Sequence, residues 1–228
     1  AYLAARIPGF AGPLTAKQFR GGQSNPTYKL ETPGQSYVLR RKPPGQLLPS
    51  AHAVDREFRV ISALHGTAVP VARAHALCTD DAVIGSAFYI MSMEEGRVFW
   101  DPTLPSQTPD ARRKIFTSKI ETLANLHVFD PEKIGLGDFG KPGNYFARQL
   151  KRWSEQWAKL RRDHADNPPP HRVAAWLAEP APASELQSLC HGGFRIGNVM
   201  FHATEPRVIG VLDWELSTLG HPFADLAF

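Results

Sequence analysis

The sequence has only two cysteines in 228 residues, Cys78 and Cys190. They stand far apart, no C-x-x-C pair occurs, and neither has a histidine partner at the spacing of a zinc motif. Neither a disulfide framework nor a structural zinc site is therefore predicted. Free cysteines are typical of reducing compartments, so we predict a cytoplasmic protein.

Long apolar runs are also missing. No uninterrupted run approaches the ~18 to 20 residues that a membrane span requires, and no charged-then-apolar leader opens the chain, so we expect no membrane contact. The net charge is +4, but it is spread along the chain rather than gathered into an arm, so we expect no nucleic-acid partner. With 43% hydrophobic residues, the chain can bury one large core or two small ones.

A third absence is the most informative. The stretch His191-Gly192-Gly193-Phe194-Arg195-Ile196-Gly197-Asn198 fits the pattern H-G-D-x-x-x-x-N except at its third place, where Gly193 replaces a carboxylate. In kinase-like phosphotransferases that carboxylate is the base for the acceptor hydroxyl, while an amide and a second carboxylate bind Mg²⁺. The amide is present as Asn198, and the apolar run that follows ends at Asp213.

Asn198 and Asp213 flank a predicted hairpin. Residues 198–201 and 207–212 are rich in branched and aromatic side chains, as strands are, and the short link between them carries turn residues. The first residue of one strand then lies beside the last of the other. We therefore expect Asn198 and Asp213 to meet and to bind a hard cation through oxygen. The alternative is that each residue only caps a turn.

Two other motifs fail on their context. Residues 135–140 match G-x-G-x-x-G, but they follow a helix and a turn, and Pro142-Gly143 stands where a helix should begin. The same segment spells D-F-G, yet Asp138 precedes the catalytic stretch, whereas the metal-binding aspartate of a kinase follows it. No Walker A motif occurs. We interpret residues 135–140 as a loop.

Residues 14–93 are predicted to be mainly strands with one helix. Extended segments at residues 17–20 and 27–30 enclose the loop Gly21-Gly22-Gln23-Ser24-Asn25-Pro26, whose N–H groups could bind phosphates; a plain hairpin turn is the alternative. The next strand, residues 37–40, ends at Arg40. This side chain either reaches the same phosphates or stays at a solvated strand end.

A helix over residues 53–64 and a buried strand over residues 86–93 complete this half. Glu57 stands beside the apolar stripe of the helix, where a kinase needs a carboxylate to hold the basic strand residue; a rim position is the alternative. Glu94-Glu95-Gly96 then breaks the strand, which predicts a lobe boundary near residue 95. Met91 and Met93 stand at this candidate hinge, whose backbone could bind an adenine.

From residue 96 the chain is predicted to be mostly helical. Thr108-Pro109-Asp110 begins a helix with a cap residue, a first-turn proline and an acid near the positive end. His127 on this helix is interpreted as a packed, hydrogen-bonded residue. The predicted buried residues are Ile115, Phe116, Ile120, Leu123 and His127 on this helix, and Leu150, Trp153, Trp157 and Leu160 on a second helix over residues 144–162.

These stretches resemble the aminoglycoside phosphotransferase/choline kinase-like family, above all the branch whose members occur alone or fused to acyl-CoA dehydrogenases. The resemblance rests on residues 19–26, 37–45 and 212–222 and covers nearly the whole chain. It implies an α+β, bilobal protein-kinase-like fold, with an antiparallel sheet plus helix in the N-lobe and a mostly helical C-lobe. It implies ATP in the cleft, a catalytic loop that contains His191, and Mg²⁺ held by Asn198 and Asp213. Arg40 would bind phosphate, paired with Glu57.

The resemblance also sets the expected domain limits. We predict a nucleotide-binding lobe at residues 1–95 and a catalytic lobe at residues 96–228. The C-lobe is expected to be incomplete, with about a hundred further residues of helix beyond Phe228 that shape the acceptor pocket.

Gly193 is the departure from the family. Relatives carry an aspartate there that orients and deprotonates the acceptor hydroxyl, and glycine can do neither. General-base catalysis contributes roughly 10² to 10⁴ in rate, so we expect severely impaired transfer with nucleotide binding retained. Slow transfer could survive, because positioning and metal electrostatics supply much of the catalysis. Gly193 is an inactivating variant, an error or the mark of an evolved pseudokinase.

The leading functional prediction is an ATP- and Mg²⁺-dependent phosphotransferase that acts on the hydroxyl of a metabolite. The branch resemblance favours a hydroxyacyl-CoA over an antibiotic as acceptor, and an acyl-CoA dehydrogenase as fused or separate partner. Two alternatives stay open. One is a catalytically silent nucleotide-binding module that regulates a partner, and the other is a nonfunctional fragment with exposed apolar surface.

Overall fold

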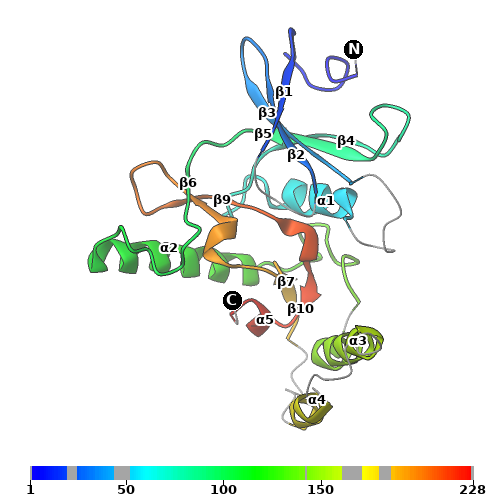
Figure 1. Ribbon diagram of the computed structural model, residues 1–228, viewed down its shortest axis with the longest axis vertical. Coiled ribbons are helices and arrows are strands. Elements are labelled where there is room, and N and C mark those ends of the chain that lie inside the picture. The colour runs from blue at the N-terminus through cyan, green and yellow to red at the C-terminus, as the bar shows by residue number, and fades with distance from the viewer. Residues whose placement is uncertain are drawn as a thin grey trace.

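The N-terminal half forms one antiparallel sheet of five strands in the order β1-β2-β3-β5-β4 (Figure 1). The structure is a computed structural model that describes residues 2–19, 25–43, 52–141, 143–160, 171–179 and 186–226. The strands are β1 Thr15–Gln18, β2 Thr27–Glu31, β3 Ser36–Arg41, β4 Ala74–Cys78 and β5 Phe88–Ser92. The strands predicted near residues 27–30, 37–40 and 86–93 are confirmed, the first strand lies two residues earlier than predicted, and β4 was not predicted.

Helix α1, Val54–Leu64, packs against β4 and β5 (Figure 1). Its buried face repeats at helical spacing and includes Val54, Ile61 and Leu64. The hydrophobic core that contains this face continues without interruption into the C-terminal half, where it includes Phe139 and Trp214. One core therefore fixes α1 against both lobes.

The C-terminal half is mainly helical around two small sheets. Its helices are α2 Pro109–His127, α3 Tyr145–Leu160, α4 His171–Ala178 and α5 Phe223–Leu226. Its strands are β6 Arg97–Val98, β7 Ser188–Cys190, β8 Val199–Phe201, β9 Val208–Val211 and β10 Thr218–Gly220. The sheets are β6-β8-β9 and β7-β10. Together with the N-terminal sheet and α1, these elements confirm the predicted α+β, bilobal kinase-like fold. No helix in the described ranges is long and apolar enough to cross a membrane.

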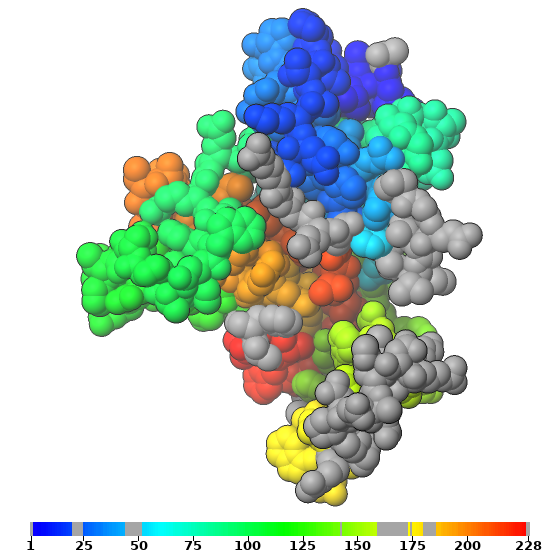
Figure 2. Space-filling model, in the orientation of Figure 1, coloured from blue at the N-terminus to red at the C-terminus, as the bar shows by residue number. Residues whose placement is uncertain are grey.

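The predicted buried faces of α2 and α3 were partly wrong. On α2, Ile115 and Leu123 are buried, but Phe116 and Ile120 are 37% and 48% exposed, and Lys119 is buried instead. On α3, Trp153 and Trp157 are 62% and 36% exposed. Among the described elements α3 packs mainly on α4, and both helices lie at the end of the molecule away from the N-lobe, as Figures 1 and 2 show. An apolar face that periodicity predicts is buried only where a neighbouring element packs against it.

Gly96 lies where the chain crosses from β5 to β6, near the lobe boundary that the sequence predicts at residue 95. A Cβ atom at this position would stand 2.4 Å from the carbonyl oxygen of Phe201 and 2.7 Å from the side chains of Met200 and Ile209. The crossing therefore presses against the β8–β9 hairpin closely enough to require glycine. The boundary itself stays a prediction.

We expect Gly96→Ala to lower the free energy of unfolding by about 1–3 kcal/mol, because the added methyl group would meet the Phe201 carbonyl oxygen as well as the side chains of Met200 and Ile209. Urea denaturation measures this loss. The control is Gly210→Ala on β9, where a Cβ would stand 3.6 Å from Met200 Cβ and meet no close contact. Equal stability of the two variants would contradict the tight crossing.

Candidate functional site

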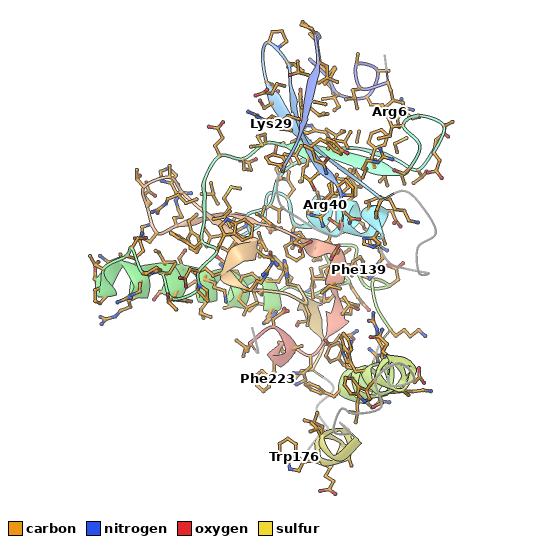
Figure 3. All side chains as sticks on the ribbon, viewed as in Figure 1. Arg6, Lys29, Arg40, Phe139, Trp176 and Phe223 are labelled. Carbon is orange, nitrogen blue, oxygen red and sulfur yellow. The ribbon has the colours of Figure 1, made fainter. Side chains whose placement is uncertain are left out.

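Arg40, the last but one residue of β3 (Figure 3), contacts carboxylates from both lobes. Its Nε lies 3.0 Å from Glu57 Oε2, and its Nη2 lies 2.7 Å from Asp213 Oδ1 and 3.5 Å from Glu215 Oε2. The contact with Asp213 is a hydrogen bond, whereas Nε faces Glu57 without hydrogen-bond geometry. Burial disfavours the guanidinium charge, but the carboxylates, Glu57 foremost, outweigh this and raise the pKa of Arg40.

Glu57, on α1, is held by more than Arg40. It is 1% exposed, and its two oxygens accept hydrogen bonds from Asn25 Nδ2 at 2.8 Å and from the Tyr89 hydroxyl at 3.0 Å. Burial raises the pKa of Glu57 to about 7, although Arg40 and the Tyr89 hydroxyl favour the ionised form. The rim position considered for Glu57 is therefore excluded. Asn25 is 1% exposed, and its amide group contacts Glu57 and His52.

The β8–β9 hairpin brings the chain near Asn198 back to Asp213. Val199 pairs with Val211, and the N–H of Leu212 donates to the carbonyl oxygen of Asn198 at 2.8 Å. Asn198 is the last residue of a short 3-10 turn. Strand β8 therefore begins at Val199, one residue later than predicted. Asp213 has φ 66°, a left-handed conformation that non-glycine residues adopt rarely and often at functional sites.

The loop of residues 191–198 folds over this hairpin. The ring Nε2 of His191 lies 2.8 Å from the Leu212 carbonyl, which can only accept a hydrogen bond, and its Nδ1 accepts the N–H of Gly193. Both ring nitrogens are therefore engaged, and burial lowers the pKa of His191. His191 thus ties the loop to the residue before Asp213. Its geometry suits positioning better than direct contact with reactants.

The two glycines of this loop differ in what they permit. Gly192 has φ +82°, and a Cβ there would stand 2.6 Å from the Leu216 carbonyl, so it must be glycine. At Gly193 a Cβ would meet only Asn198 Nδ2 at 3.7 Å and His191 Nδ1 at 3.9 Å, which are ordinary contacts. The backbone at residue 193 therefore has room for a Cβ atom, the first atom of a side chain such as aspartate.

Asp225, on α5, holds the backbone of the loop of residues 191–198. Its carboxylate accepts the N–H groups of His191 at 2.8 Å and Gly192 at 2.7 Å, and it lies 2.9 Å from His127 Nε2. Although burial opposes ionisation, these bonds hold the pKa of Asp225 below its ordinary value. His127 is therefore a hydrogen-bonded partner of the loop anchor, in agreement with its interpretation from the sequence. Asp225 was missed, because nothing in its spacing links it to a loop 33 residues earlier in the chain.

His127, Cys190 and Asp225 place possible ligand atoms within 4.8 Å of one another. These atoms do not suit a metal ion. Both Asp225 oxygens already accept hydrogen bonds, and Cys190 Sγ lies 3.3 Å from the His221 carbonyl oxygen. Burial also raises the pKa of Cys190 to about 12, so the thiol stays protonated. This cluster is part of the loop's support.

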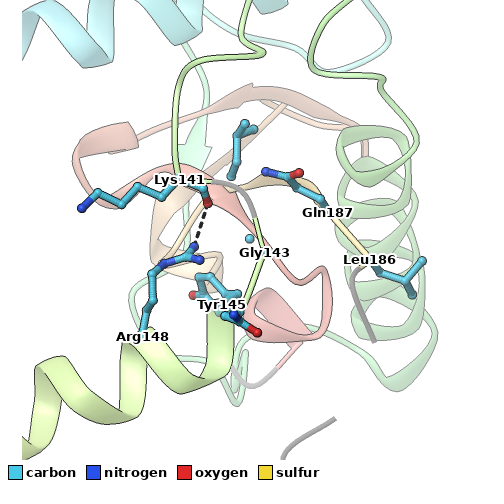
Figure 4. A pocket seen from close by; sticks show the side chains of 9 residues that line it. Lys141, Gly143, Tyr145, Arg148, Leu186 and Gln187 are labelled. Atoms are coloured by element: carbon cyan, nitrogen blue, oxygen red, sulfur yellow. Dashed lines mark hydrogen bonds between the residues drawn. The ribbon is translucent and has the colours of Figure 1, made fainter. Parts of the chain in front are cut away.

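Of the remaining predicted ligand-binding residues, those that the structure describes form no hydrogen bond or ion pair with the carboxylates around Arg40, and the others lie outside the described residues. Met91 lies near the end of β5 and Met93 directly after it, both partly buried, where the chain leaves the N-lobe sheet. Gly21, Gly22 and Ser24 lie outside the described residues. A separate small pocket at the start of α3 is lined by Lys141, Tyr145, Arg148, Gln187 and their neighbours (Figure 4). It does not include the carboxylates around Arg40.

The fold is that of the kinase-like phosphotransferases. Residues 15–228 match the sequence pattern of the Phosphotransferase enzyme family, and the chain belongs to this family. A putative aminoglycoside phosphotransferase from Ralstonia eutropha is 49% identical, with a TM-score of 0.86 over 99% of this chain and 66% of that one. The streptomycin–ATP–APH(2")-IIa complex shares the fold, with a TM-score of 0.69 at 15% identity over 92% of this chain and 70% of that one.

Among curated proteins the chain is similar to acyl-CoA dehydrogenase family member 11 of Gallus gallus, at 47% identity over 100% of the chain. It is 46% identical to a probable acyl-CoA dehydrogenase of Arabidopsis thaliana, again over 100% of this chain. The chain spans 30% and 29% of these two relatives. The resemblance to this branch of the family is thereby confirmed.

We expect Asp225→Asn to lower the free energy of unfolding at pH 7 by roughly 2–4 kcal/mol, because the buried charge that accepts these bonds is lost. The pKa of Asp225 is depressed in the folded state, so its contribution is full above an unfolded pKa of about 4 and is lost as the pH falls through the folded value. The gap between wild type and variant should close in acid.

Chemical denaturation at several pH values measures this gap. Asp110→Asn, a change in an exposed ion pair at the start of α2, is the control and should alter stability little. A gap that widens as the pH falls would contradict the assigned charge state of Asp225.

Proposed function

We propose that this chain is the nucleotide-binding and transfer domain of an ATP- and Mg²⁺-dependent small-molecule phosphotransferase, with transfer to a hydroxyl impaired at Gly193. The observation that carries the proposal is the convergence of Arg40, Glu57 and Asp213 from separate elements, 173 residues apart in the case of Arg40 and Asp213. A kinase-like site needs a fixed cation for phosphates and a carboxylate for the metal at this junction.

The oxygen atoms near Asp213 fit a hard cation. Asn198 donates its amide NH₂ to the Gly193 carbonyl at 3.0 Å, which leaves the amide oxygen as the free acceptor of the group. Asp213 uses Oδ1 for Arg40, and Glu215 Oε2 is buried without a hydrogen-bond partner. Mg²⁺ prefers oxygen ligands and would accept such a set, with Asn198 and Asp213 as ligands and Glu215 nearby.

Arg40 would then serve the phosphates. Arg40 contacts both Glu57 and Asp213. A metal ion bound to Asp213 would compete with Arg40 for the Asp213 carboxylate. The guanidinium would then be available to bind a polyphosphate. Arginine suits this role because its planar group binds phosphate oxygens in pairs. Mg·ATP would supply the phosphoryl group. The glycine-rich segment with Gly21, Gly22 and Ser24, and the hinge with Met91 and Met93, are proposed to contact the nucleotide.

The relatives guide the choice of acceptor. The similar curated proteins are named as acyl-CoA dehydrogenases, which favours a hydroxyacyl-CoA or a related metabolite and a fused or partner dehydrogenase. Streptomycin and ATP appear in the complex of a distant relative, which supports a nucleotide and a hydroxylated small molecule in this fold. The second candidate function is a silent nucleotide-binding module, and the carboxylate missing at Gly193 favours it.

We expect Mg·ATP to raise the melting temperature of the full-length protein. At a ligand concentration about 100-fold above Kd, binding adds roughly 2.7 kcal/mol to the free energy of unfolding. In Asp213→Asn, the part of this stabilisation that depends on Mg²⁺ should be lost. In Asp130→Asn, at an exposed turn, it should be retained. Differential scanning calorimetry with ATP, with and without Mg²⁺, measures both. An equal response of the two variants would remove Asp213 from the metal site.

We expect Gly193→Asp to raise kcat for phosphoryl transfer by roughly 10² to 10⁴, because it restores a general base where the backbone has room for one. Turnover of ATP with a panel of hydroxylated metabolites, hydroxyacyl-CoAs included, measures the gain. Gly193→Asn is the matched control, since it has nearly the same size but cannot accept the proton. Flat turnover in Gly193→Asp with intact Mg·ATP binding would favour the silent module.

A further inference from the structure

Residues 135–140, which carry the G-x-G-x-x-G and D-F-G patterns, lie against α1. They belong to the C-lobe, yet their contacts with this N-lobe helix run through two arginines one helical turn apart, Arg56 and Arg59. Figure 3 shows Phe139 just below α1. The segment therefore joins the lobes at the helix that carries Glu57.

Arg56 makes the tighter contact. Its Nη2 donates to the Phe139 carbonyl at 2.8 Å and lies 3.3 Å from the Ser217 carbonyl, and its guanidinium stacks 3.9 Å from the Phe139 ring centroid. Two carbonyls and a ring face together match a planar guanidinium and do not match an ammonium group. Arg56 thus joins α1 to two separate segments of the C-lobe.

Arg59 makes a second, outer contact. It donates to the Gly135 carbonyl at 2.7 Å and forms an ion pair with Asp138, whose side chain is 77% exposed. An exposed ion pair of this kind contributes little by itself. Of the two arginine contacts, the inner one through Arg56 is therefore the one expected to contribute more to the position of the helix.

The segment that α1 contacts is rigid in its attachment to the C-lobe. Leu136 and Phe139 are buried in the core. A Cβ at Gly140 would stand 2.8 Å from the Leu219 N–H nitrogen and from Thr218 Oγ1, so the backbone of residue 140 lies directly on β10. Movement of α1 relative to the C-lobe would have to break contacts with this fixed segment.

The position of α1 matters because of what it carries. Glu57 follows Arg56 directly, and Ser217 follows the 3-10 turn that Asp213 begins. The carboxylates around Arg40 thus come from two elements, α1 and this turn, and Arg56 bonds one to the other. A change in that spacing would move Glu57 away from Asp213 and leave Arg40 with one of them.

We propose that residues 135–140 and Arg56 form an interlobe clamp, in which Arg56 is a positioning residue that sets the spacing of Glu57 and Asp213 and thereby the place of the Arg40 guanidinium. The inference rests on the proposed function, because Arg40 acts here as a phosphate ligand. The clamp also gives residues 135–140 a role that neither of their motif patterns describes.

The test compares the binding of Mg·ATP and of adenosine to the full-length protein by calorimetry. Arg56→Ala should weaken Mg·ATP binding by roughly tenfold or more, since hydrogen bonds from a charged group are lost, and should change adenosine binding little because adenosine has no phosphates. Arg56→Lys should recover only part of the affinity. Phe139→Leu keeps both carbonyls, removes the ring face and should give a smaller loss in the same direction.

The control for a general effect of an arginine is Arg113→Ala on the exposed face of α2. The decisive control is the Arg40→Ala background, in which Arg56→Ala should cause no further loss of Mg·ATP affinity, because Arg56 acts through Arg40. Equal weakening of Mg·ATP and adenosine, additive losses in the double variant, or normal Mg·ATP binding by both Arg56→Lys and Phe139→Leu would overturn the clamp. A wild-type protein that binds no Mg·ATP would overturn the proposed function and the clamp with it.

Discussion

The position of one charge, the Arg40 guanidinium, organises the junction between the lobes. A cation whose side chain is 13% exposed needs charged partners, because removing it from water costs several kcal/mol. Those partners are Glu57 on α1 and Asp213 with Glu215 after β9, so the N-lobe sheet, its helix and the C-lobe hairpin must meet at this point. The shared hydrophobic core holds them there.

The loop of residues 191–198 is supported independently of the residue at position 193. Asp225 binds its backbone N–H groups, His191 bonds to the Leu212 carbonyl, and Gly192 packs on Leu216. None of these contacts uses a side chain at residue 193. An exchange between aspartate and glycine would therefore alter the chemistry of the loop while its shape stays the same, which is why both the impaired enzyme and the silent module fit this scaffold.

Local sequence patterns predicted the parts of the structure that depend on near neighbours. The strands around Arg40, the helix with Glu57 and the β8–β9 hairpin follow from alternation, periodicity and turn residues, and the pairing of Glu57 with Arg40 followed from the family resemblance. The parts that failed depend on distant segments. Trp153 and Trp157 are 62% and 36% exposed although periodicity predicted a buried stripe, and the contacts of Asp225 and Arg56 join residues whose sequence separation carries no pattern.

The cost of the carboxylate cluster itself supports a ligand. Buried ion pairs can often be replaced by well-packed apolar residues with no loss of stability, so Arg40 and Glu57 are not needed merely to hold the lobes together. The cluster moreover leaves Arg40 Nε and Glu215 Oε2 buried without hydrogen bonds, which a site built for stability alone would avoid. A metal-bound polyphosphate offers a cation to the carboxylates and oxygen acceptors to the guanidinium. Under the proposed function, these are the groups that such a ligand would satisfy.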